Sequence, residues 1–81
     1  MNPAEIRSVV MEVLESVAPE IDKSVLDPRK PLRGQVDLDS MDWLNCELEL
    51  SRRFGLEIPE QDYSRLGTLE AIIAYLEERL R

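Results

Sequence analysis

The chain has 81 residues, of which 33 % are charged and 43 % are hydrophobic, so a single globular domain over residues 1–81 is the expected organisation. The formal net charge of -7 disfavours nucleic acid or anionic lipid as a partner. The lack of histidine and the single cysteine exclude histidine-based catalysis, histidine metal sites and an internal disulfide.

The first predicted element is a helix that begins after Asn2 and ends near Ala18. Asn2, Pro3 and Glu5 are typical of an N-cap, a first-turn proline and a capping box. Pro19 disfavours helical geometry in the residue before it and so ends the helix. The apolar residues at helical spacing are Ile6, Val9, Val10, Val13, Leu14 and Val17.

Acidic residues interrupt this apolar pattern, and no later run approaches the roughly 18 apolar residues that a membrane span needs. We therefore expect a soluble protein without a signal peptide or anchor, in a reducing and cytoplasmic compartment.

Residues 20–38 form a long predicted connection, because they show no sustained period and contain Pro28, Pro31 and Gly34. Loops beyond roughly 12 to 15 residues are uncommon in compact domains, so we expect the scattered apolar residues to pin this one across the bundle. The sequence is compatible with a turn of helix near residues 22–26.

A second helix is predicted from the N-cap Asp39 to Phe54, before Gly55. On a helical projection its apolar residues divide into two flanks. The first flank holds Trp43, Cys46, Leu50 and Phe54, and the second holds Met41, Leu44 and Leu48. Only one flank can face the core, so the other is expected to remain partly exposed beside acids, as in a protein-docking surface.

Residues 60–66 are predicted to form one or two helical turns, and Gly67 and Thr68 follow as breaker and cap. The last amphipathic helix carries Leu69, Ile72, Ile73, Leu76 and Leu80. The expected fold class is therefore all-α, a four-helix bundle of three longer helices and one short helix with a long first loop.

Ser40 lies just inside the predicted start of the second helix, where backbone N–H groups and the helix dipole favour an anion on its side chain. As a nucleophile it has no support, because no GxSxG turn surrounds it and no histidine can take its proton. Its hydroxyl must therefore be activated by another protein. On local features alone, an ordinary serine of a first helical turn is the alternative.

Three acids, Asp37, Asp39 and Asp42, flank this serine and would repel a phosphate rather than bind it. We assign them to capping and to attraction of a basic partner. They do not form a calcium loop, because the sixth position from Asp37 is Asp42 instead of glycine and the twelfth is Leu48 instead of glutamate. No metal site is expected.

The run from Asp39 to Asp42 resembles the DSL(D/E) attachment motif of acyl carrier proteins, and the resemblance extends over nearly the whole chain. Phe54, the run 57–59 and the pair Thr68 and Leu69 look like further landmarks of that family. In the family, four helices, a long first loop and a modified serine at the start of the second helix recur. The resemblance implies a single acyl-carrier-like domain over residues 1–81.

The resemblance also implies that a phosphopantetheinyl transferase attaches the 4'-phosphopantetheine arm of coenzyme A to Ser40. The protein would then hold acyl intermediates as thioesters and present them to enzymes of fatty-acid-like or specialised lipid or secondary-metabolite biosynthesis, and would catalyse nothing itself. The partner-docking residues that the family implies are Asp39, Met41, Asp42, Leu44 and Leu48.

Several residues depart from the carriers of general fatty-acid synthesis. Where those carriers have acids, this chain has Asn45, Ser51, Arg52 and Arg53, so its docking face is less negative. The enzymes of general fatty-acid synthesis are therefore expected to bind this chain poorly. Trp43 stands where a smaller residue is usual, and either packs on the arm, blocks an acyl pocket or is a partly buried core residue. Glu47 replaces an apolar core residue, which implies a rotated helix or a contact with a cation or solvent.

Two other features have plain structural interpretations. Cys46 has no evident group that would lower its pKa, so we interpret it as a small core residue. The basic cluster Arg29, Lys30 and Arg33 is either ordinary surface charge or a means of discriminating among partners.

The partner and cargo remain open at this stage. The sequence around Trp43 resembles specialised bacterial carriers, which implies loading by an acyl- or aminoacyl-adenylating ligase or an acyltransferase, and docking to other basic-surfaced enzymes. An aminoacyl or peptidyl carrier shares the same attachment chemistry. From a different class, an unmodified acidic helical adaptor could bind a basic partner through the second helix. We expect a monomer without nucleic-acid or membrane partners.

Overall fold

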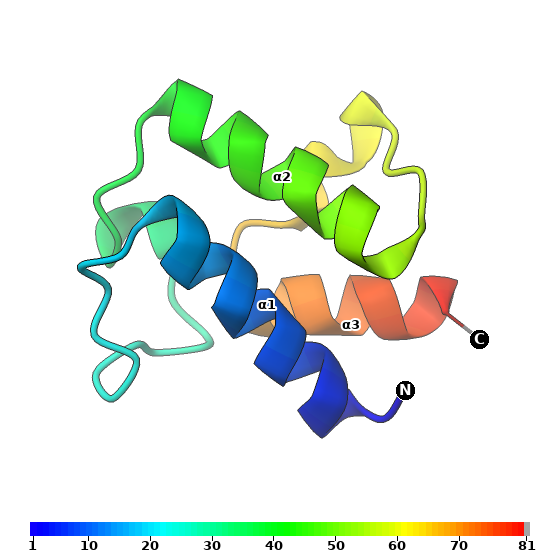
Figure 1. The fold of residues 1–81 in the computed structure, drawn as a ribbon, viewed down its shortest axis with the longest axis horizontal. Coiled ribbons are helices and arrows are strands. Elements are labelled where there is room, and N and C mark those ends of the chain that lie inside the picture. The colour runs from blue at the N-terminus through cyan, green and yellow to red at the C-terminus, as the bar shows by residue number, and fades with distance from the viewer. Residues whose placement is uncertain (81) are drawn as a thin grey trace.

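The computed structural model describes residues 1–80, which form three α-helices and two 3-10 helices (Figure 1). Their bounds are α1 Pro3–Val17, η1 Leu32–Gly34, α2 Ser40–Phe54, η2 Glu60–Arg65 and α3 Leu69–Arg79. Within these residues no strand forms, and one isolated bridge pairs Pro31 with Thr68. The predicted all-α class, with three longer helices, a short one at residues 60–65 and a long first connection, is confirmed.

Capping side chains start the long helices where the sequence predicts. The Asn2 side chain accepts the Glu5 N–H at 2.9 Å, and the Glu5 carboxylate accepts the Asn2 N–H at 3.2 Å, which completes the capping box. Asp39 accepts the Asp42 N–H at 2.8 Å, and Thr68 caps α3 in the same way. Each side chain satisfies a backbone donor that has no partner within its helix.

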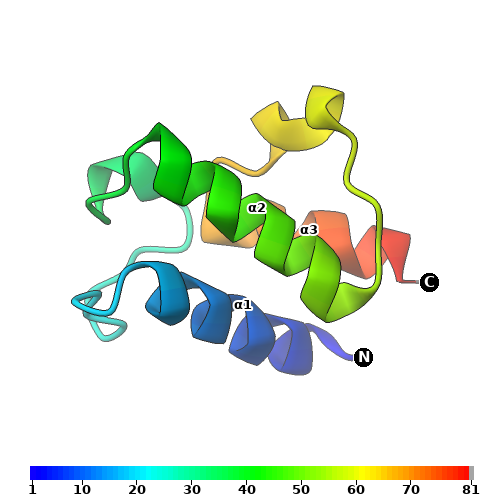
Figure 2. The same cartoon turned by 45° about the horizontal axis from the view of Figure 1, so that its top comes forward.

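α1 is the helix against which both other long helices pack (Figure 1 and Figure 2). Its inner face has no exposed surface at Ile6, Val10, Val13 and Leu14. The other helices complete the core with Cys46, Leu50, Leu69, Ile72, Tyr75 and Leu76. Full burial of a large apolar side chain contributes about 1.5–3 kcal/mol, so a domain of this size depends on this shared core.

The long connection between α1 and α2 is pinned to the core, as the sequence predicts. Its buried residues are Leu26, Leu32 and Val36. The side chain of Gln35 holds the loop together, because its Oε1 accepts the Asp27 N–H at 2.5 Å and its Nε2 donates to the Asp27 carbonyl at 2.8 Å. Residues 22–26 form only a turn, so no helix occurs there, whereas the short helix η1 was not predicted.

Two backbone hydrogen bonds fasten the same connection to the start of α3. The Leu32 N–H donates to the Gly67 carbonyl at 2.9 Å, and the Glu70 N–H donates to the Pro28 carbonyl at 2.9 Å. The connection and the entry to α3 therefore form one hydrogen-bonded junction.

Tyr75 joins η2 to α3 from inside the core. It is buried, and its hydroxyl donates to Asp62 of η2 at 2.7 Å. Arg79 donates to the same carboxylate at 2.8 Å, and the Arg65 guanidinium lies 4.9 Å from the Tyr75 ring centroid. Tyr75 was not among the core residues predicted from the sequence.

In the described part of the chain, no helix combines the length and the apolar character that crossing a membrane requires.

Gly55 ends α2 in the left-handed region, with φ 63°. Its N–H donates to the Ser51 carbonyl and so closes the last turn of the helix. A side chain there would be strained even though the space around the Cα is open.

We expect Gly55→Ala to lower the free energy of unfolding by about 1 kcal/mol, because only glycine adopts this backbone conformation without strain. Gly34→Ala is the matched control, since Gly34 also borders open space but has no positive φ. Urea denaturation should place the midpoint of the Gly55 variant below those of the control and the wild type. Equal midpoints would contradict the account of this helix end.

Candidate functional site

Ser40 is the first residue of α2, and its side chain is exposed. The cap formed by Asp39 fixes the chain on one side, and the helix places its N–H groups and positive dipole end at this turn. Asp37 and Asp39 are exposed and Asp42 is partly buried. Ser40 therefore lies at an accessible, electropositive helix end within an acidic rim.

The outer face of α2 exposes a strip of large apolar side chains. Met41 is 66 %, Leu44 39 % and Leu48 53 % exposed, while Cys46 and Leu50 of the same helix are buried. The predicted division of α2 into a core flank and an exposed flank is thus confirmed. The exposed strip begins directly beside Ser40.

A groove of about 500 Å³ opens beside Ser40, and its lining was not predicted from the sequence. One wall is α2, through Trp43, Leu44 and Glu47. The opposite wall is η2 with Tyr63, and Arg33 of η1 also lines the groove. Three separate segments of the chain form these walls, so no local sequence pattern could have indicated the groove.

Glu47 is buried in the wall of this groove, with 3 % of its surface exposed. The expected rotation of α2 does not occur, because Cys46 and Leu50 stay in the core, and no ion pair to Glu47 forms within residues 1–80. Glu47 instead lines the groove beside Ser40. Among residues 1–80 the Oε2 atom also has no hydrogen-bond partner. Burial raises the pKa of Glu47 to about 7, although the charge of Arg33 opposes this rise.

The neighbours of Glu47 are a tryptophan, an arginine and a cysteine. Trp43 is partly buried, and the Arg33 guanidinium carbon lies 6.0 Å from its ring centroid. Cys46 is buried, and this burial raises the pKa of its thiol to about 12, so Cys46 is the unreactive core residue that the sequence indicates. The predicted basic cluster of Arg29, Lys30 and Arg33 does not form one group. Arg33 lies over Trp43, whereas Arg29 forms an ion pair with Glu70 at 3.7 Å.

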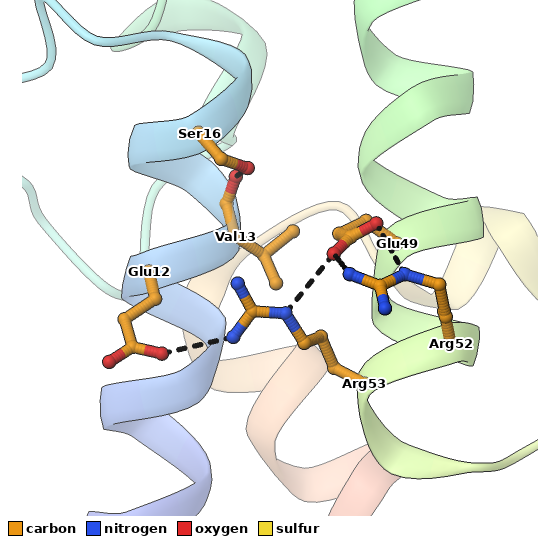
Figure 3. Close-up of polar contacts among 6 residues, drawn as sticks. All are labelled: Glu12, Val13, Ser16, Glu49, Arg52 and Arg53. Carbon is orange, nitrogen blue, oxygen red and sulfur yellow. Dashed lines mark hydrogen bonds and ion pairs between the residues drawn. The ribbon is translucent and has the colours of Figure 1, made fainter.

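Arg52 and Arg53 at the far end of α2 both contact Glu49 (Figure 3). The Nε atoms of the two arginines each lie 3.1 Å from a carboxylate oxygen of Glu49, which lowers the pKa of that carboxyl. Arg53 also donates through Nη1 to Glu12 of α1 at 3.1 Å. It therefore ties two helices together, in addition to making the end of α2 less negative. No local sequence pattern indicates this contact between distant residues.

Within the described residues, no cluster of acids and cysteine is arranged to hold a metal ion.

Comparisons with known proteins give one consistent result. The family model described as "Phosphopantetheine attachment site" matches residues 4–76. The acyl carrier protein of Chlorobium luteolum is 29 % identical over 76 residues, which cover 94 % of this chain and 96 % of the relative. That of Rubrobacter xylanophilus is 25 % identical over 75 residues, covering 89 % and 93 %. The meromycolate extension acyl carrier protein of Mycobacterium tuberculosis is 27 % identical over 74 residues, covering 91 % of this chain and 64 % of the relative.

We expect Glu47 to make the folded protein less stable as the pH rises. The pKa of its carboxyl is about 7 in the folded state and 4.5 ordinarily, so its protonated form favours folding below pH 4.5 and this contribution is lost as the pH rises through 7. After allowance for solvent at the groove, the loss is on the order of 1–2 kcal/mol.

Glu47→Gln should remove this fall in stability with rising pH, and Glu57→Gln, a change at an exposed glutamate, should keep it. The measurement is urea denaturation of the three proteins from about pH 5 to about pH 8. The account is wrong if the wild type and Glu47→Gln show parallel pH profiles.

Proposed function

Since the chain belongs to the phosphopantetheine attachment-site family of acyl carrier proteins, we propose that Ser40 is the residue that bears its 4'-phosphopantetheine cofactor. When bound, the cofactor supplies a terminal thiol on a flexible arm, which holds an acyl group as a thioester. The protein is a carrier and not an enzyme. Tethering raises the effective concentration of the cargo once a partner enzyme has docked.

The exposure of Ser40 at the start of α2 is the observation that carries this assignment. A transferase can reach the hydroxyl, and the N-terminal end of α2 favours the negative charge of a phosphodiester. The neighbouring groove offers room of about 500 Å³ on the same side of α2. The residues present therefore fit the cofactor. We assign the general base to the transferase, since the chain offers no histidine for this role.

We assign partner docking to the strip around Ser40. Its exposed apolar contacts are Met41, Leu44 and Leu48, and its charges are Asp39 and Asp42. An apolar centre with an acidic edge fits a basic enzyme surface, since complementary charge speeds the encounter and apolar contact holds the complex. The partners proposed on this basis are a phosphopantetheinyl transferase, an acyl-adenylating ligase or acyltransferase, and further basic-surfaced biosynthetic enzymes.

We propose that these partners act in fatty-acid-like or specialised lipid or secondary-metabolite biosynthesis, in the cytoplasm, on a monomeric carrier. One relative is named for meromycolate extension, which makes a pathway of that kind one option. An aminoacyl or peptidyl cargo is the second candidate, because the attachment chemistry is the same. The family match favours both of these over an unmodified adaptor.

Incubation with coenzyme A, magnesium and a broad-specificity phosphopantetheinyl transferase should increase the intact mass by one phosphopantetheine. Ser40→Ala should abolish this increase, because it removes the only oxygen that we assign to attachment. Ser64→Ala is the matched control, since Ser64 is also exposed and lines the same groove. An unmodified wild type with several transferases, or a modified Ser40→Ala, would overturn the assignment.

Leu48→Ser should weaken binding of the transferase about 5- to 10-fold, the effect of losing an apolar contact inside an interface. Val25→Ser provides the control, because Val25 is 74 % exposed but belongs to the connection before α2. Surface plasmon resonance on the Ser40→Ala background measures binding without modification. Equal affinities of the two variants would remove Leu48 from the docking surface.

A further inference from the structure

Glu47 is the one charged residue that the described chain buries without a partner. Its surface is 3 % exposed, and its Oε2 has no hydrogen bond among residues 1–80. A buried carboxyl in this condition destabilises the fold, whereas an apolar residue would fill the same position without that cost. The fold therefore does not explain a glutamate here, but a ligand that binds to it would.

The position of Glu47 relative to Ser40 points to the source of that ligand. Both residues line the same groove, together with Trp43 and Leu44. The spacing of three or four residues places these side chains along one side of α2. Glu47 is seven positions after Ser40, so it lies about 10 Å further along the helix axis. A group tethered to Ser40 that enters the groove passes Trp43 and Leu44 before it reaches Glu47.

The charged and titratable groups around Glu47 leave its carboxyl available. Arg33 of η1 lies over the Trp43 ring and makes no ion pair with Glu47 among the described residues. Glu60 and Tyr63 of η2 line the opposite wall, and the neighbouring Cys46 is buried in the core. None of these side chains satisfies Oε2, which therefore favours a hydrogen-bond donor from outside the fold.

We propose that this groove is a binding site for an N–H group carried on Ser40, with Glu47 as its hydrogen-bond acceptor and Trp43 and Leu44 as its apolar wall. The inference rests on the proposed attachment of the cofactor to Ser40. The N–H group has two sources, an amide of the pantetheine arm or an amine of the cargo. A plain alkyl chain would leave Glu47 unpaired, so the site selects amide- or amine-bearing groups.

The test compares the apo protein with the holo protein and with two loaded forms, one bearing an alkanoyl group and one an aminoacyl group, each joined to the arm sulfur through a methylene thioether that resists hydrolysis and adds no N–H group. Intact mass reports attachment to Ser40. Carboxyl-carbon NMR of ¹³C-glutamate-labelled protein follows the titration of Glu47, whose signal is assigned by its loss in Glu47→Gln. The chain has a single tryptophan, so acrylamide quenching of its fluorescence reports the accessibility of Trp43.

We expect the titration midpoint of Glu47 to fall by about 1 when the donor binds, because a hydrogen bond to the carboxylate favours its charged form. Quenching of Trp43 should decrease at the same time. Both changes on formation of the holo protein identify an arm amide as the donor. Changes that occur with the aminoacyl form alone identify the cargo amine.

Glu47→Leu should fold, as circular dichroism would verify, and should lose the protection of Trp43. Glu47→Gln keeps an acceptor oxygen and should therefore retain the protection of Trp43. Glu60→Gln is the control, since Glu60 is an exposed acid of the same groove. A mass increase without any change at Glu47 or Trp43 would overturn this inference alone, as would equal protection in Glu47→Leu. A wild type that gains no mass would instead overturn the proposed function, and this inference with it.

Discussion

The burial of one face of α1 is the constraint on which the rest of the structure depends. In so short a chain one core must serve every helix, and the inner face of α1 supplies the surface against which both α2 and α3 pack (Figure 1). This packing sets the rotation of α2, because Cys46 and Leu50 must point toward α1. The same rotation leaves Leu48 and Ser40 at the surface. The accessibility of Ser40 is thus a consequence of the core.

The helix boundaries could be predicted from the sequence because their causes are local. Asn2, Asp39 and Thr68 each cap a donor three residues away, and Gly55 ends α2 through its own backbone conformation. The exposed flank of α2 followed from helical periodicity, which is also local. The resemblance to acyl carrier proteins added what no single helix reveals, the proposed role of Ser40 as the residue that bears the cofactor.

What could not be predicted depends on contacts between distant segments. Arg53 reaches Glu12 on another helix, and the hydroxyl of the buried Tyr75 donates to Asp62 of η2. The unpaired state of Glu47 depends on where Arg33 lies, which only the folded loop determines. The groove beside Ser40 likewise exists only after η1, α2 and η2 come together. The sequence shows that a glutamate, Glu47, occupies a core position. It does not show whether a neighbouring group would pair with its carboxylate.

The junction between the long connection and the entry to α3 has a mechanical consequence. The Leu32 N–H is bonded to the Gly67 carbonyl, and Pro31 pairs with Thr68, so residues just before Arg33 are held by the segment that follows η2. The groove rim at Arg33 and the tether of η2 thus share one anchorage. Because these backbone contacts belong to the entry of α3, that entry sets the position of two of the three segments that line the groove, whereas packing on α1 positions the third, α2.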